Sequence, residues 1–138
     1  MKIVALIGLL IAGTSYAQPA AEASIEGMWK NPIGSAIIEI APCRDALCGR
    51  VVWASQRGQR EVAKNTSNVV GTIVLTNLKP TNGRWEGSLY IPDDNIHVSA
   101  KLQLLSDRRL QLTGCGLLGL ICRTQLWTRV DGPLPDRG

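Results

Sequence analysis

Apolar and polar residues alternate along much of this chain, in short runs that turn residues separate. The clearest run is 96–104, in which every second residue is apolar and the others are polar. A period of two is typical of a β-strand with one buried face. From residue 27 onward no run shows the 3.6-residue period of an amphipathic helix. The pattern therefore predicts an all-β protein.

The runs predict eight strands that short turns connect. Asn31-Pro32, Asn82-Gly83 and Ser106-Asp107 are among the turn residues between neighbouring runs. The polar segment 55–68 is predicted as a long loop or a short exposed helix. The predicted strands are residues 27–30, 35–41, 47–54, 70–78, 84–91, 96–104, 109–113 and 123–130.

Eight strands that each carry one apolar face need an arrangement that covers those faces. A flat sheet would expose two edges, whereas an up-and-down barrel has none. A two-sheet sandwich is the alternative, but it usually needs crossing connections, and these loops are too short for them. We therefore predict an eight-stranded antiparallel up-and-down barrel over residues 27–131, with a flexible arm at 18–26 and a flexible tail at 132–138.

The interior of an eight-stranded barrel is either filled by side chains or holds one small ligand. The chain has four tryptophans and no phenylalanine, and all four tryptophans fall on predicted strands, where they are expected to form much of the core. The residues predicted to face inward and line a ligand site are Ile38, Val52, Leu75, Trp85, Leu89, Val98, Leu102, Leu112 and Leu126.

The first 17 residues have the pattern of a secretory signal peptide. Lys2 precedes the apolar run 3–12, and the small residues Ser15 and Ala17 stand where a signal peptidase reads. A buried N-terminal helix is the alternative. The run is shorter than the ~20 residues that span a bilayer, and no later segment looks transmembrane. We predict cleavage after Ala17 and a periplasmic or secreted protein.

The charge of the chain is mild and scattered. Loss of Lys2 with the leader lowers the net charge from +4 to +3. The only adjacent basic pair is Arg108-Arg109. Nucleic-acid binding needs a basic patch or stripe, so this class of function is not expected.

Four cysteines occur as two local pairs with spacings that suit neither zinc nor redox chemistry. Zinc sites prefer C-x2-C or similar spacings and thioredoxin-like sites need C-x-x-C, so no metal or cofactor is expected. Export favours disulfides. Three connectivities exist, and each local pair brackets a turn between two predicted strands. We predict the disulfides Cys43–Cys48 and Cys115–Cys122.

The second cysteine pair encloses a run of large apolar residues between glycines. This tip consists of Leu117, Leu118, Leu120 and Ile121. It is either a contact surface for a partner or a plug that folds over the end of the barrel.

No catalytic arrangement is evident in the sequence. His97 falls on the polar face of its strand, and Asp93-Asp94 stands in a turn, where acidic side chains commonly bond the backbone. The chain has no phosphate loop, dinucleotide fingerprint or Gly-x-Ser-x-Gly motif. We predict that the protein is not an enzyme.

The first and last strands resemble those of lipocalins. Gly27-Met28-Trp29 is similar to their Gly-x-Trp signature, and Arg129 matches the arginine that crosses this tryptophan at the closed end of the barrel. The resemblance implies that Trp29 and Arg129 form a cation–π pair that closes one end.

Almost the whole exported chain resembles the bacterial exported family known as domain of unknown function 2147. The matching segments are IIEIAPCRDALCGRVVW, VVGTIVL, GRWEGSLYIPDDNIHVSAKL and LTGCGLLGLICRTQLWTRV. The chain departs from the family pattern at 55–68, which lacks an Asn-Pro, and at Asn95-Ile96-His97, where members often carry Gly-Lys. The resemblance implies a barrel and export, and no known activity.

Two functions fit these observations. In the first, the barrel carries a small hydrophobic ligand, with 55–68 as its lid. In the second, the core is solid and the protein is an envelope module or inhibitor that contacts a protein partner through the tip and 55–68.

Overall fold

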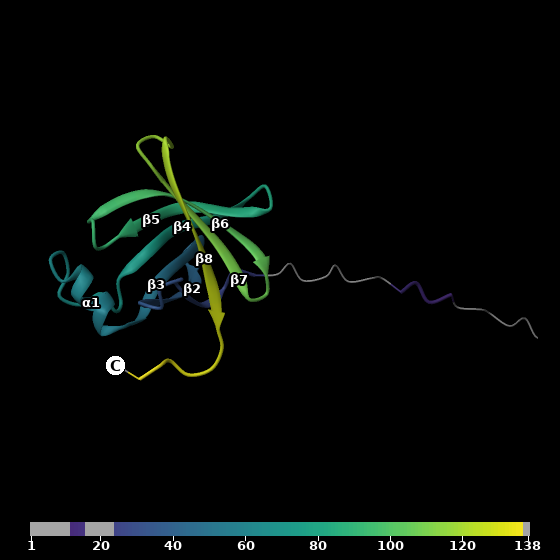
Figure 1. Cartoon of the computed structure of the whole chain (residues 1–138). Helices are drawn as coiled ribbons and strands as arrows, with labels where there is room; N and C mark the ends of the chain where they lie inside the picture. The colour runs from purple at the N-terminus through teal and green to yellow at the C-terminus, as the bar shows by residue number, and fades with distance from the viewer. Residues whose placement is uncertain (1–11, 16–23, 137–138) are drawn as a thin grey trace, which may run out of the picture.

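The computed structural model describes residues 12–15 and 24–136, which form eight strands, one helix and connecting turns. Each strand pairs antiparallel with the next, and β8 pairs with β1, so that the sheet closes into the predicted barrel (Figure 1). Most of the predicted signal peptide, its cleavage point and most of the predicted arm lie outside the described residues. The elements are β1 Gly27–Lys30, β2 Ala36–Cys43, β3 Ala46–Ala54, α1 Gln56–Val62, β4 Ile73–Thr81, β5 Arg84–Ile91, β6 Ile96–Ser106, β7 Arg109–Gly116 and β8 Ile121–Val130.

The polar segment after β3 contains the short helix α1. Ser55 caps this helix, because its side-chain oxygen accepts a hydrogen bond from the backbone amide of Gly58. β4 begins at Ile73, three residues later than predicted, because residues 69–72 form a turn. The Gly71 amide of this turn donates to the carbonyl of Val51.

Both predicted disulfides are present. Cys43–Cys48 joins β2 to β3, and Cys115–Cys122 joins β7 to β8, with Cα–Cα distances of 5.8 and 4.1 Å. β7 and β8 extend beyond the predicted strands, up to the pair Gly116 and Ile121. The second disulfide therefore crosses a paired ladder and pins the hairpin just below its turn.

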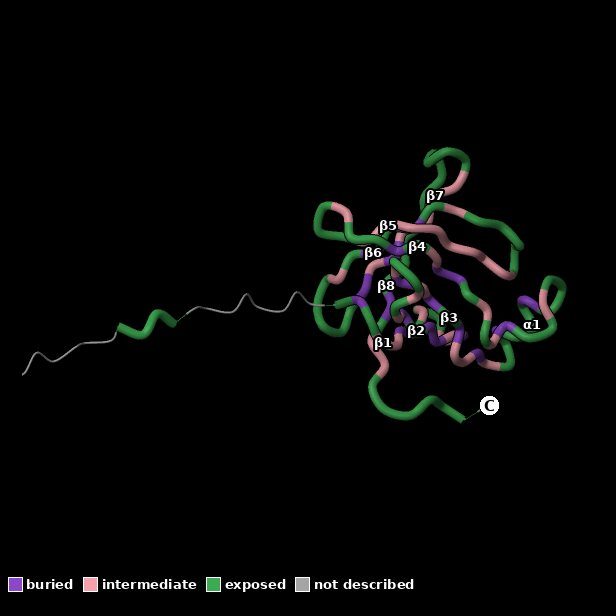
Figure 2. The backbone as a smooth tube through the Cα atoms, turned by 180° about the vertical axis from the view of Figure 1, so that it is seen from behind, coloured by how far each residue is buried: buried purple, intermediate pink, exposed green. Residues whose placement is uncertain are grey.

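The core fills the middle of the barrel and extends to the end where β1 begins, which we call the closed end. Trp29, Leu75, Leu78, Leu102 and Leu110 have no exposed surface. Figure 2 shows buried residues gathered in the barrel wall, whereas the turns at its ends are exposed. Burial of each large apolar side chain contributes about 1.5–3 kcal/mol, so these residues supply much of the driving force for folding.

Arg129 closes this end by covering Trp29. Its guanidinium carbon lies 4.2 Å from the centre of the indole ring. The guanidinium also donates hydrogen bonds to the backbone carbonyls of Ser24, Glu26 and Asp107, at 3.1, 2.7 and 2.5 Å. Arg129 thereby joins the N-terminal segment, the β6–β7 turn and β8 at one point.

The Gly-x-Trp motif has a direct structural reason in this arrangement. Gly27 has a φ of +121°, and a Cβ atom there would lie 2.6 Å from Nη1 of Arg129. The indole nitrogen of Trp29 donates to the carbonyl of Ile25 at 2.8 Å. The glycine admits the arginine, and the hydrogen bond fixes the ring that the arginine covers.

A β-bulge in β3 corrects two predictions about side-chain direction. Ile37 pairs with Trp53 and Ile38 pairs with Val51, so Val52 is an extra residue without a partner on β2. Val51, and not Val52, takes the interior position opposite Ile38. The bulge also puts Trp53 on the outer face. The prediction that this tryptophan belongs to the core was therefore wrong.

The last strand is also tied to the β6–β7 turn by an ion pair. Arg108 donates to the carboxylate of Asp131, and the amide of Arg129 donates to the carbonyl of Arg108 at 2.9 Å. The hydrogen bond from Arg108, and then its positive charge, lower the pKa of Asp131 from its ordinary value of 3.8.

We expect Arg129→Ala to destabilise the barrel by about 2–4 kcal/mol, because it removes the cation–π contact and three charge-assisted hydrogen bonds. Urea unfolding followed by tryptophan fluorescence measures this change. Arg109→Ala, an exposed arginine on β7, is the control and should change stability by less than about 0.5 kcal/mol. Equal unfolding midpoints for the two variants would contradict the role of Arg129.

We expect Arg108→Ala to raise the pKa of Asp131 toward 3.8, as measured by NMR titration of the carboxyl group. The carboxyl pKa is lowered in the folded state. The pair therefore contributes stability above the ordinary pKa, and this contribution is lost as pH falls through the lowered value. An unchanged pKa in the variant would show that Arg108 is not the cause.

Candidate functional site

Seven of the nine residues predicted to line a ligand site face the interior of the barrel. Cross-strand pairs place them there, since Trp85 pairs with Leu102, Leu102 with Leu112, and Leu89 with both Leu75 and Val98. They differ in burial: the residues near the closed end or in the middle of the barrel are buried, except Trp85, and those toward the other end are half-buried. The buried ones are Ile38, Leu75, Leu102 and Leu112, and the half-buried ones are Trp85, Leu89 and Val98.

Leu126, like Val52, does not face the interior. Trp127 pairs with Leu110, and both are buried, so the odd-numbered residues of β8 face inward and Leu126 faces outward. Leu126 is 44% exposed. The prediction was wrong because Leu126 and Trp127 are both apolar, and alternation alone does not decide which of two adjacent apolar residues is inside.

The end of the barrel opposite Arg129 is less completely packed, and we call it the open end. On β5 and β6, the interior residues Leu89 and Val98 are half-buried and Ile96 is exposed. Gly114 on β7 lies beside them, because a Cβ atom at this position would be 3.3 Å from both Leu89 Cδ2 and Val98 Cγ2. These residues form an apolar surface that faces inward and remains partly accessible.

β8 is paired on only one side toward the open end. β1 pairs with β8 at three positions, the last of which joins Lys30 to Thr128. Within the part of the chain that the structure describes, residues 121–127 pair with β7 alone, and residues 121–126 are exposed. The barrel wall is therefore not closed between Thr128 and the open end.

The unpaired part of β8 places two polar side chains on its inner face. Arg123 pairs with Gly114 and Gln125 pairs with Leu112, so both side chains share the inward face with their partners. The side-chain oxygen Oε1 of Gln125 accepts a hydrogen bond from the indole nitrogen of Trp127 at 3.0 Å. Sequence reasoning missed these residues. The sequence did contain a signal. The predicted first strand, 27–30, has four residues and is too short to pair with all eight residues of the predicted last strand, 123–130.

Helix α1 and the turn after it cover part of the open end. Val62 and Val69 are buried in the hydrophobic core. The side-chain amide of Asn65 donates to the carbonyls of Pro92 and Asp93, at 2.8 and 2.9 Å. The segment 55–68 is thus tied to the β5–β6 turn at this end of the barrel.

Open hollows occur on the surface at the closed end. One, of about 440 Å³, is bordered by Leu104, Arg108 and Arg129. Another, of about 320 Å³, is bordered by Leu47, Leu78 and Trp85. Neither coincides with the apolar surface at the open end.

The tip, residues 117–121, projects from the barrel. Leu118 is fully exposed, and Leu120, Leu117 and Ile121 are 84, 69 and 54% exposed. The hairpin stands away from the rest of the wall (Figure 1). Of the two arrangements considered from the sequence, the tip adopts the exposed one and does not fold over the end of the barrel.

The backbone of the tip has an unusual conformation for leucine. Leu117 and Leu118 have φ values of 49° and 57°, and the Gly119 amide donates to the Gly116 carbonyl at 3.1 Å. Gly119, the next residue of this four-residue loop, has a φ of 85°, and glycine and asparagine are the residues that adopt positive φ most readily. The left-handed conformation costs a residue with a Cβ atom about 1–2 kcal/mol.

His97 lies on the outer face and stacks on Tyr90, with 4.8 Å between the ring centres. Tyr90 donates to the Asn95 side chain at 3.0 Å. In residues 12–15 and 24–136, no three His, Cys, Asp or Glu side chains gather closely enough to hold a metal ion. Across the same residues, no helix has the length and apolar character needed to cross a membrane.

Comparison with solved structures relates this barrel to a known fold. Protein HP1028 from Helicobacter pylori, described as belonging to the lipocalin family, matches with a TM-score of 0.60 and 15% sequence identity. The match covers 79% of this chain and 84% of that one. At this identity the likeness shows the fold alone, which is a lipocalin-like barrel.

Comparison of sequences gives the family. No curated protein matches the chain. Residues 27–129 match the family model described as "Uncharacterized protein conserved in bacteria (DUF2147)". This bacterial family and the two disulfides indicate a protein that works outside the cytoplasm. The match spans every strand of the barrel, and the chain belongs to the DUF2147 family.

Proposed function

We propose that this protein is a periplasmic, non-enzymatic carrier that binds a small hydrophobic ligand at the open end of its barrel. The observation that carries the proposal is the uneven packing of the interior. The interior-facing side chains Leu89 and Val98 remain partly accessible, next to a stretch of β8 that has no partner on its other side. Barrels of eight strands are wide enough to hold one small ligand, and lipocalin-like folds commonly do so.

The chemistry of the open end favours an amphiphile with a carboxylate. Leu89, Val98 and Gly114 supply the apolar surface that an alkyl chain needs. Arg123 and Gln125, on the inner face of β8, supply donors for an anionic or polar head group. A fatty acid of medium length fits this combination of one apolar wall and one basic edge.

Delivery to the periplasm fits the leader expected at residues 1–17, with cleavage after Ala17. The oxidising compartment maintains the two disulfides that pin the hairpins at either end. Segment 55–68, tied to the β5–β6 turn through Asn65, serves as the lid over the ligand.

A second candidate is a binding module with a solid core, which contacts an envelope protein through the tip and 55–68. The exposure of the tip favours this role, because four large apolar side chains in contact with water are unusual on a monomer. The tight packing around Trp29 and Leu102 is also compatible with it.

The carrier function is tested by titrating the disulfide-bonded protein with saturated fatty acids of increasing chain length, with tryptophan fluorescence as the readout. We expect a saturable change, because Trp127 is hydrogen-bonded to Gln125 at the edge of the proposed site. No saturable change at any chain length would contradict the carrier function.

Two variants locate the site. Gly114→Val places a side chain against Leu89 and Val98 and should weaken binding at least about tenfold, a loss of about 1.4 kcal/mol. Leu126→Asn, on the outer face of the neighbouring strand, is the control and should bind as the wild type does. Arg123→Ala should weaken the binding of fatty acids but not the binding of the alcohols with the same chain length. Circular dichroism establishes that each variant is folded.

A further inference from the structure

The tip combines exposed apolar side chains with a rigid backbone. The Cys115–Cys122 disulfide holds its two strands together, and the amides of Gly119 and Leu120 donate to the carbonyls of Gly116 and Leu117, at 3.1 and 3.2 Å. Two of the amides in the turn are thus satisfied within the tip. Backbone groups paired in this way lower the cost of leaving water for an apolar medium.

The leucines of the tip occupy positions that local preference assigns to other residues. The β4–β5 and β5–β6 turns of the same barrel have Asn82 and Asn95 at positive φ, and the β2–β3 turn has Arg44. The β7–β8 turn instead has two adjacent apolar residues there, Leu117 and Leu118. Bulky residues held in a sparsely populated conformation point to a functional constraint. Asparagine or glycine would adopt these φ values more easily, so the turn geometry does not explain the leucines.

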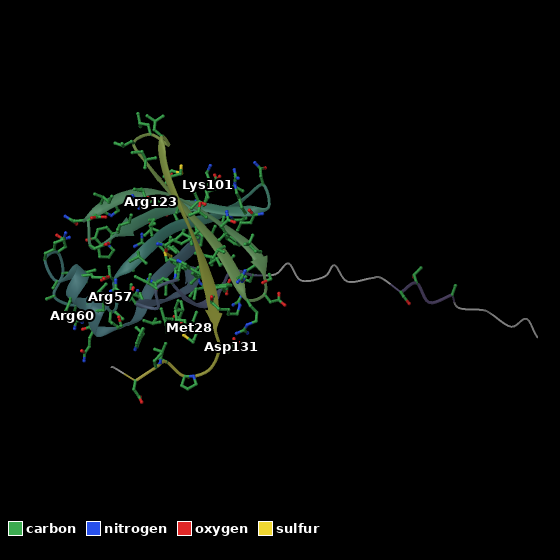
Figure 3. The ribbon with its side chains drawn as sticks, in the orientation of Figure 1. Met28, Arg57, Arg60, Lys101, Arg123 and Asp131 are labelled. Atoms are coloured by element: carbon green, nitrogen blue, oxygen red, sulfur yellow. A yellow bond between two sulfur atoms is a disulfide. The ribbon has the colours of Figure 1, made fainter. Side chains whose placement is uncertain are left out.

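The charges around the tip are basic. The β7–β8 hairpin, residues 109–130, contains no Asp or Glu. Lys101 and Arg123 lie near the base of the tip (Figure 3). They stand on opposite faces, since Lys101 shares the outer face with Thr113 and Arg123 the inner face with Gly114. The acidic pair at 93–94 belongs to the β5–β6 turn, on a hairpin that diverges from the tip (Figure 1).

From these three features we infer that the tip docks the protein on an anionic lipid bilayer, with its leucines in the interfacial region and Lys101 and Arg123 facing the lipid head groups. Apolar side chains that enter the acyl boundary and basic groups beside them are the two contributions that interfacial anchors combine. The inference goes beyond ligand binding and does not depend on it.

The size of the tip favours a lipid surface over a protein partner. A stable protein interface takes ~20–30 residues from each side, and the tip is a narrow, convex turn of five residues. Its four side chains contain about as many hydrocarbon carbons as one myristoyl chain, which alone gives only weak, reversible membrane binding. The basic residues at the base supply the second signal that such an anchor needs.

The test is flotation of the disulfide-bonded protein, isolated from the periplasm, with vesicles of phosphatidylcholine with or without phosphatidylglycerol. We expect the protein to float with the anionic vesicles and to be released as salt rises from about 0.05 to 0.5 M. Leu117→Ser with Leu118→Ser should lower partitioning at least about tenfold. The matched control, Leu105→Ser with Leu126→Ser, removes two exposed leucines elsewhere and should leave it unchanged.

A second measurement separates the lipid surface from other partners of the tip. Sedimentation velocity without vesicles should show the same oligomeric state for the wild type and the tip variant. The inference is overturned if the wild type does not float with anionic vesicles, or if the tip variant floats as well as the wild type. It is also overturned if the tip mediates self-association that vesicles do not disrupt. Fatty-acid titration does not involve the tip leucines. Failure of the flotation test therefore leaves the carrier function intact, and failure of the titration leaves the membrane inference intact.

Discussion

The barrel depends on the contact between Arg129 and Trp29. β1 has only four residues and pairs with β8 at three positions, so few backbone hydrogen bonds hold the first strand to the last. Arg129 reinforces this junction by stacking on the indole and donating to carbonyls from the N-terminal segment and the β6–β7 turn. One side chain thus connects the segments that meet where the sheet closes on itself, and Gly27 is required so that it can approach.

The same short junction creates the asymmetry of the molecule. Near Arg129 the wall is complete and the interior is solid, because every strand has two neighbours and large side chains fill the space. Beyond Thr128 the last strand loses its second neighbour, and its inner face presents Arg123 and Gln125 to the interior. Stability therefore concentrates at one end, whereas accessible apolar and polar groups meet at the other, where α1 provides partial cover.

The β7–β8 hairpin continues this division beyond the barrel. Its lower half belongs to the core through Leu110 and Trp127, whereas in its upper half the turn and β8 are exposed and β7 is half-buried. A disulfide compensates for the missing packing by joining the two strands below the turn. The turn itself places leucines in a conformation that favours asparagine and glycine. A membrane-facing tip and an apolar site at the open end would lie on one strand pair, so that a ligand could pass from a lipid surface to the barrel over a short distance.

The sequence by itself determined the strands, their order and the two disulfides, because alternation, turn residues and local cysteine pairs are all short-range signals. It also carried the family pattern and the Gly-x-Trp motif. Only the tertiary structure decided which of two adjacent apolar residues faces inward, and it chose Val51 over Val52 and Trp127 over Leu126. The reason is physical: a single bulge, or the register with a neighbouring strand, reverses every direction after it. The pairing between strands that are distant in sequence likewise decides that one edge of β8 is unpaired and that the tip is exposed. No local pattern encodes this pairing.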